Sequence, residues 1–310
     1  MLIGMVMASV ASIVGLSGPA SSAGPPQDYS LTSSTQIYLG DVTSTPAAQT
    51  MVQQHIESTG LCEPTSAFKV FNLTLAGNAL PENGVSDHMV MHKDWVPLSA
   101  SRVTATGGAN YNVSIRPSGG APMLDDGCGS SGPGDAPGGT GWVYQGRACP
   151  VRIDNSRGWL DHCFWYHKLA GDENPNEEYW AFSGKNTFKS KGIWWMDDAW
   201  WGVTRSPGHE NMLNWWGADP DSTLSSTPCT DITLGVSVPI GPAEPTLNFD
   251  WQKCERIIPN QNAQTGAYRV NWDGLTRDTR TLKGILVTGV VQQIPDWVPS
   301  WDLNVGFKAD

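Results

Sequence analysis

The segment from residue 231 to residue 254 constrains the fold more than any other part of the chain. Apolar residues alternate with small or polar residues on both sides of the sequence GPAEP: Ile232, Leu234, Val236 and Val238 precede it, and Leu247, Phe249 and Trp251 follow it. A period of two on both arms is typical of strands with one buried face, and Gly and Pro favour a turn between them. The segment therefore predicts an antiparallel β-hairpin.

Shorter runs extend this pattern. Examples are QIYLGDV at 36–42, FKVFNLTL at 68–75 and NYNVSI at 110–115, each bounded by Gly, Pro, Asn or Ser as strands commonly are. Helical spacing occurs at 47–58, AAQTMVQQHIES, where one side would carry Met51, Val52, His55 and Ile56. We expect a mostly β fold, antiparallel β-sandwich-like and stapled by disulfides, with one short N-terminal helix.

Composition divides the chain into five segments. Residues 2–16 form an apolar run, and Ser21 and Ala23 are small residues before an expected cleavage site at Gly24, although no Lys or Arg precedes Lys69. Residues 117–141 are rich in Gly and Pro and lack the apolar side chains of a core. We expect a signal peptide at 1–23, a flexible arm at 24–35, an N-terminal β-rich region at 36–116, a Gly/Pro-rich loop at 117–141 and a Trp-rich β domain at 142–310.

The cysteines agree with a secreted, extracellular protein. An even number, six in all, predicts disulfides in an exported chain. The hairpin would bring Cys229 to Cys254. Closure of the Gly/Pro-rich loop favours Cys128 with Cys149, which leaves Cys62 with Cys163.

The charge balance narrows the classes of partner. The chain has a formal net charge of −11. Binding of nucleic acid requires a basic face that displaces counterions, and anionic lipid attracts clusters of basic residues. We therefore expect no nucleic-acid partner and no membrane contact, and the oligomeric state stays open.

Tryptophan is the residue type that most suggests a binding role. Ten of the fifteen tryptophans lie between residues 142 and 216, and six form adjacent pairs: Trp194 and Trp195, Trp200 and Trp201, and Trp215 and Trp216. Neighbouring residues of a strand point to opposite faces, so each pair would direct one ring inward and one outward. Three outward rings would form an aromatic face for a glycan or a cell-surface partner. The alternative is that the rings only fill a core.

Two acidic residues, Asp197 and Asp198, lie between the first two tryptophan pairs. The simplest interpretation is a hairpin turn at MDDA, because Asp favours turns, although contact with a sugar or a metal ion stays open. Acidic residues in an apolar cleft could also serve a polysaccharide hydrolase. Calcium is a possible ligand of GADPDST at 217–223 and LDDG at 124–127, but neither matches the spacing of an established calcium loop.

Three functions follow from these patterns. The favoured one is a secreted, non-catalytic protein that binds a glycan or a cell-surface partner through the Trp-rich region, because no G-x-S-x-G nucleophile or HExxH array is present. The alternatives are a secreted polysaccharide hydrolase and a structural or toxin-like secreted protein. No cofactor is expected apart from the calcium ion considered above.

Export with oxidised cysteines is directly testable. N-terminal sequencing of secreted material should begin at or near Gly24, because the signal peptide would be removed there. Thiol labelling should detect no reactive cysteine before reduction. A cytosolic protein with six reactive thiols would contradict this expectation.

Overall fold

A computed structural model describes residues 35–75, 87–105, 108–119, 137–171, 177–207, 213–225, 229–238, 244–262, 266–291 and 299–310. The expected signal peptide and most of the expected arm lie outside these residues, as does most of the Gly/Pro-rich loop. Residues Ser33–Asp310 form one compact unit. Within the described parts of the chain, no helix is long and apolar enough to cross a membrane.

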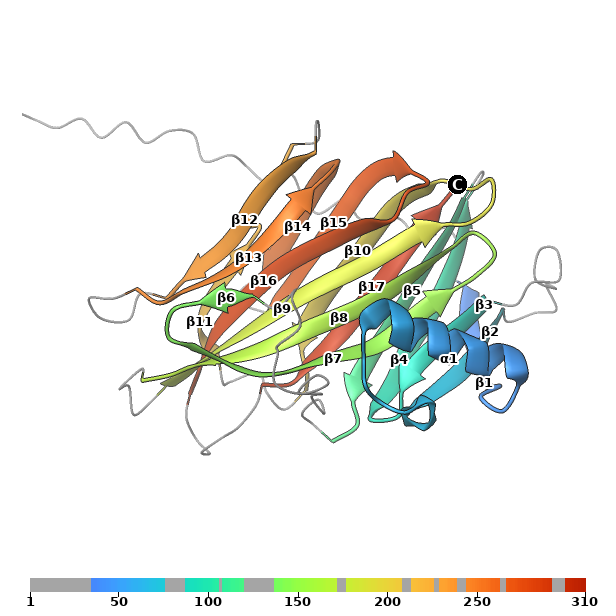
Figure 1. Cartoon of the computed structure of the whole chain (residues 1–310), viewed down its shortest axis with the longest axis horizontal. Helices are drawn as coiled ribbons and strands as arrows, with labels where there is room; N and C mark the ends of the chain where they lie inside the picture. Colours follow the sequence, from blue (N-terminus) through green and yellow to red (C-terminus); the bar gives the residue numbers. More distant parts are fainter. Residues whose placement is uncertain are drawn as a thin grey trace, which may run out of the picture. The chain divides into compact units, whose positions relative to one another are not determined.

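The chain is mostly β, and its principal strands form one continuous antiparallel sheet of 14 strands, whose two halves we call sheets A and B (Figure 1). Sheet A contains, in order, β14 (Arg256–Asn262), β15 (Ala267–Thr276), β10 (Met196–Arg205), β17 (Trp301–Ala309), β5 (Gly108–Pro117) and β4 (Trp95–Ala105). Sheet B contains β2 (Phe68–Leu75), β3 (Asp87–His92), β7 (Trp142–Asp154), β8 (Gly158–Leu169), β9 (Glu177–Ser190), β16 (Arg280–Val291) and β11 (Leu213–Asp219). Strand β1 (Thr35–Asp41) pairs with both β2 and β4 and so joins the sheets.

The two sheets pack face to face, which confirms the expected sandwich-like fold. The ring of Trp201, on β10 of sheet A, lies 5.9 Å from the ring of Phe182 on β9 and 5.7 Å from that of His162 on β8. Strands from both sides of the Gly/Pro-rich loop share these sheets, since β5 pairs with β17 and β3 pairs with β7. The core therefore combines side chains from both regions.

The predicted hairpin is confirmed and covers part of the outer face of sheet B. It consists of β12 (Thr230–Ser237) and β13 (Thr246–Lys253), which form a small sheet with β6 (Gly138–Gly139). Its apolar side chains alternate in burial as expected, and the ring of Phe249 lies 5.6 Å from that of Trp165 on β8. The predicted disulfide between Cys229 and Cys254 closes the open end of the hairpin.

The other two predicted pairings are wrong, because Cys149 is bonded to Cys163. These residues lie on the adjacent strands β7 and β8, where an irregular register brings their Cα atoms to 4.0 Å. Closure of the Gly/Pro-rich loop predicted Cys128 as the partner of Cys149. The pairing of β7 with β8 instead makes Cys163 its partner. Cys62 is also disulfide-bonded, and Cys128 lies outside the described residues.

The predicted helix is confirmed as α1 (Pro46–Thr59), which lies over strands of sheet B (Figure 1). The hydroxyl of Thr45 caps its first turn by accepting from the amide of Ala48. A short 3₁₀ turn, η1 (Thr65–Ala67), follows the helix. Val52 and His55 are fully buried, so the expected apolar side of the helix faces the sheet.

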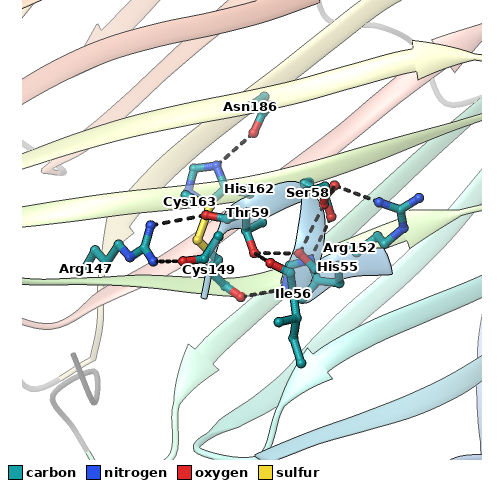
Figure 2. Close-up of a disulfide and its surroundings, with 12 residues drawn as sticks. His55, Ile56, Ser58, Thr59, Arg147, Cys149, Arg152, His162, Cys163 and Asn186 are labelled. Carbon is teal, nitrogen blue, oxygen red and sulfur yellow. Dashed lines mark hydrogen bonds and ion pairs between the residues drawn. A yellow bond between two sulfur atoms is a disulfide. The ribbon is translucent and has the colours of Figure 1, made fainter. Parts of the chain in front are cut away.

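A buried polar network fixes α1 to β7 and β8 (Figure 2). Nδ1 of His55 lies 2.7 Å from Oδ1 of Asp161, while Ser58 and Arg152 each donate to Oδ2 of Asp161 at 2.7 Å. Arg147 donates to backbone carbonyls at the C-terminal end of the helix, where the helix dipole favours a positive charge. The helix is therefore held by polar groups as well as by its apolar side.

Replacing Asp161 with Asn should destabilise the protein, because His55 would lose its buried carboxylate and Arg152 would keep only Asp154 as a charged partner. We expect urea denaturation to show a loss of about 3 kcal/mol in the free energy of unfolding. Asp278→Asn is a suitable control, since the side chain of Asp278 is largely exposed and should change stability little. Equal stabilities of the two variants would show that the network does not hold α1.

Candidate binding surface

The turn between β9 and β10 comes before the acidic pair and not at it. Trp194 donates its amide to the carbonyl of Lys191 at 3.1 Å, and Gly192 adopts a left-handed conformation with φ of 58°. Gly occupies that region without steric cost, so it provides the turn residue. Trp194 and Trp195 therefore lie in this connection, just before β10.

The predicted turn at MDDA is wrong, because Asp197 and Asp198 belong to β10 itself. Strand β10 is paired on both sides, with β15 and with β17, and both ladders are irregular between Met196 and Asp198. Asp197 has no partner in either ladder, so the irregularity is a β-bulge, which redirects side chains without ending the strand. The acidic pair consequently lies at one end of sheet A.

Trp200 and Trp201 point to opposite faces of β10, as strand geometry requires, but both are buried. Trp201 packs in the interior of the sandwich and is fully buried. Trp200 lies on the outer face of sheet A and is only 4% exposed. Its indole nitrogen donates to Asn112 at 3.1 Å, and the guanidinium of Arg269 lies 4.9 Å from its ring centroid. The described side chains therefore do not form the expected row of outward rings, and those of Trp215 and Trp216 lie outside the described residues.

Trp195 differs from the other tryptophans whose side chains are described, because 39% of it is exposed. The guanidinium of Arg277 lies 4.4 Å from its ring centroid and also donates to the carbonyl of Ile193 at 2.8 Å. The backbone of Trp195 is fixed by two hydrogen bonds with Asp310, of 2.8 and 2.9 Å. The ring is thus held in place at the end of the sandwich. Trp194, beside it, is half-buried beneath Arg157.

Exposed apolar residues gather around Trp195. Ile193 is 75% exposed and Leu275 is 62% exposed, although both are large aliphatic residues. Met196 pairs with Thr276, so Leu275 and Arg277 flank the residue opposite the start of β10. We call Ile193, Trp195, Leu275 and Arg277 the Trp195 surface. It combines aromatic, aliphatic and cationic groups.

Carboxylates lie next to this surface. On β10, Asp198 pairs directly with Asp273 of β15 and with Lys308 of β17. Lys308 forms ion pairs with Asp197 and with Asp310. The pKa of Asp198 is raised to about 7, chiefly by burial and also by the charges of Asp197 and Asp273, while Lys308 and Arg269 act in the opposite direction. Near neutral pH, Asp198 can therefore act as either a hydrogen-bond donor or an acceptor.

The described residues contain no group of three or more His, Cys, Asp or Glu side chains placed to hold a metal ion. In the segment 217–223, Oδ2 of Asp219 accepts from the amide of Gly235 at 2.6 Å and so connects β11 to the hairpin. The segment 124–127 lies outside the described residues. Binding of calcium stays a prediction.

The sequence pattern anticipated only part of this site. It selected Trp194, Trp195, Asp197 and Asp198, which the structure brings to one end of the sandwich. It missed Leu275 and Arg277, since one arginine beside one leucine carries no recognisable motif. Their position depends on the pairing of β10 with β15, which lie far apart in the sequence.

Comparison of the chain with protein-family models, with curated proteins and with solved structures finds no match.

The raised pKa of Asp198 predicts a pH-dependent stability. The protonated Asp198 side chain contributes fully to stability below the ordinary aspartate pKa of 3.8. This contribution is lost as the pH rises through about 7, because folding then buries a charged carboxylate. The variant Asp198→Asn cannot ionise. We expect it to match the parent protein at about pH 4 and to exceed its free energy of unfolding by on the order of 3 kcal/mol at about pH 8. Urea denaturation at both pH values measures this difference, and a difference that does not change with pH would contradict the assignment.

Proposed function

We propose that the protein is secreted and binds an extracellular glycan, without catalysis, through the Trp195 surface. The proposal rests on the exposed ring of Trp195. The backbone of Trp195 is hydrogen-bonded to Asp310, and the guanidinium of Arg277 contacts its ring. A ring that is already fixed loses little conformational entropy when a ligand stacks on it. Such rings are frequent anchors of binding energy.

The neighbouring groups suit a sugar. Sugar rings present C–H groups to the flat face of an aromatic ring, and Ile193 and Leu275 extend the apolar area beside Trp195. Hydroxyl groups around the sugar can bond to the guanidinium of Arg277 and to the carboxylates of Asp197 and Asp198. Exposed apolar groups beside charged ones are typical of a site that contacts a partner.

Secretion is supported by the cysteines. Cys149 and Cys163 are bonded, as are Cys229 and Cys254, and Cys62 is also disulfide-bonded. Disulfides persist in oxidising compartments and are rare in the cytosol. The apolar run and cleavage pattern of residues 2–24 support the same location.

Hydrolysis of a polysaccharide is the second candidate, and Asp198 favours it. A carboxyl group with a pKa of about 7 can serve as a general acid, and Asp273 lies directly opposite on β15. Two cavities among the described residues, of about 510 and 300 Å³, are however lined by other side chains. Binding without catalysis is therefore the better-supported function.

A glycan array probed with the secreted chain tests the proposal. We expect a defined set of glycans to bind, and Trp195→Ala should weaken that binding by about 30-fold, as loss of an anchor residue does. Trp195→Phe should retain most of the affinity, because it keeps an aromatic face. Leu98→Ala, which alters an exposed apolar residue on β4, is the matched control and should bind normally.

Two results would change the conclusion. Unaltered binding by Trp195→Ala, or the absence of any bound glycan, would overturn the proposal. Release of reducing ends from a bound glycan, lost in Asp198→Asn, would instead establish the hydrolase.

A further inference from the structure

A second candidate site lies where the β12–β13 hairpin meets the outer face of sheet B. A cavity of about 510 Å³ is lined there by residues of β9, β12, β13 and β16. Its volume falls within the range of small-molecule sites. It shares no residue with the Trp195 surface.

Two lysines give this cavity its chemical character. Lys185 on β9 and Lys283 on β16 are direct partners across the antiparallel pair, so both side chains point to the same face of the sheet. Like charges directly opposite each other destabilise a sheet. The two ammonium groups therefore bring positive charge to this wall of the cavity.

The hairpin fixes the position of Lys283. Its ammonium group donates to the carbonyl of Asp250 at 2.8 Å and lies 4.1 Å from the ring centroid of Phe249. The residue is only 7% exposed. Water screens the charge of a buried ammonium group only weakly. Such a group therefore attracts an anion more strongly than a lysine in open solvent does.

Thr281 supplies a third donor. Its hydroxyl oxygen accepts from the indole nitrogen of Trp251 at 3.2 Å, which directs the hydroxyl proton toward another acceptor. Trp251 is nearly buried and keeps this geometry fixed. Lys185, Lys283 and Thr281 therefore form a set of donors on two adjacent strands.

The opposite wall of the cavity is acidic and polar. Asp231 and Asp250 lie on the hairpin and are exposed, and the hydroxyl of Thr233 donates to the carboxylate of Asp250 at 2.7 Å. Exposed carboxylates are screened by solvent and weaken the field of the buried lysine only partly. They also provide acceptors for hydroxyl groups. The lining thus fits a ligand with one anionic group and several hydroxyls.

We infer that this cavity binds a small acidic ligand, such as an acidic sugar, and that Lys185, Lys283 and Thr281 hold its carboxylate or sulfate group. The hydroxyl groups of the ligand face Thr233 and Asp250. The site is separate from the Trp195 surface and does not depend on the function proposed there.

Calorimetric titration with three probes tests the inference: galacturonate, galactose 6-sulfate and galactose. We expect at least one acidic sugar to bind about tenfold more tightly than galactose, the gain expected from a hydrogen bond to a charged group. The comparison of galacturonate with galactose 6-sulfate decides between a carboxylate and a sulfate. Equal affinity for all three sugars, or no binding of any, would overturn the inference.

Variants of the lysines locate the site. Lys185→Gln and Lys283→Gln should each weaken binding of the acidic sugar by about tenfold or more. Lys185 is the less buried of the two, so its variant remains informative if Lys283→Gln does not fold. Lys189→Gln, which alters an exposed lysine on the same strand outside the cavity, is the matched control and should bind normally. Normal binding by Lys185→Gln would overturn the inference.

A cross-test keeps the two sites distinct. Trp195→Ala should leave the titration with the acidic sugar unchanged, even where it abolishes binding on the glycan array. Loss of both activities in this one variant would show that the cavity is not a separate site.

Discussion

The indole ring of Trp201 lies between the two sheets at a point where sheet B carries no side chains. Gly184 on β9 and Gly284 on β16 are direct partners, and a Cβ added at either would come within 3 Å of the ring, at 2.7 and 2.9 Å. This fit sets the position of β10 over sheet B. Because side chains alternate along a strand, it also fixes the outward direction of Trp200 and Asp198 and, on sheet B, of Lys185 and Lys283.

Much of the fold could be predicted from local pattern. The alternation at 231–254 gave the hairpin and its disulfide, and the helical spacing at 47–58 gave α1 with His55 on its buried side. The pairing of Cys149 with Cys163 could not be predicted in this way. It depends on an irregularity between β7 and β8, which follows from their tertiary register and not from the spacing of cysteines.

The candidate site was predicted less completely, for a related reason. Adjacent tryptophans were expected to divide between core and surface, and Trp201 does face the core. The exposure of Trp200 could not be predicted from its own strand. Arg269 on β15 lies over its ring, and Asn112 on β5 accepts a hydrogen bond from its indole nitrogen. Likewise, the raised pKa of Asp198 arises from burial and from charges that include Asp273 on a different strand. Chemistry at the outer face depends on which strands become neighbours.

The glycine pair and the lysine pair are consecutive along β9 and β16, and this adjacency limits how the two strands can change in length. Removal of one residue from β9 ahead of Gly184 would shift its register and direct a lysine toward Trp201 and a glycine toward the cavity. One deletion would then disrupt both the packing around Trp201 and the lining of the outer cavity. Insertions and deletions in related chains should therefore fall in the connections, while the lengths of β9 and β16 stay constant.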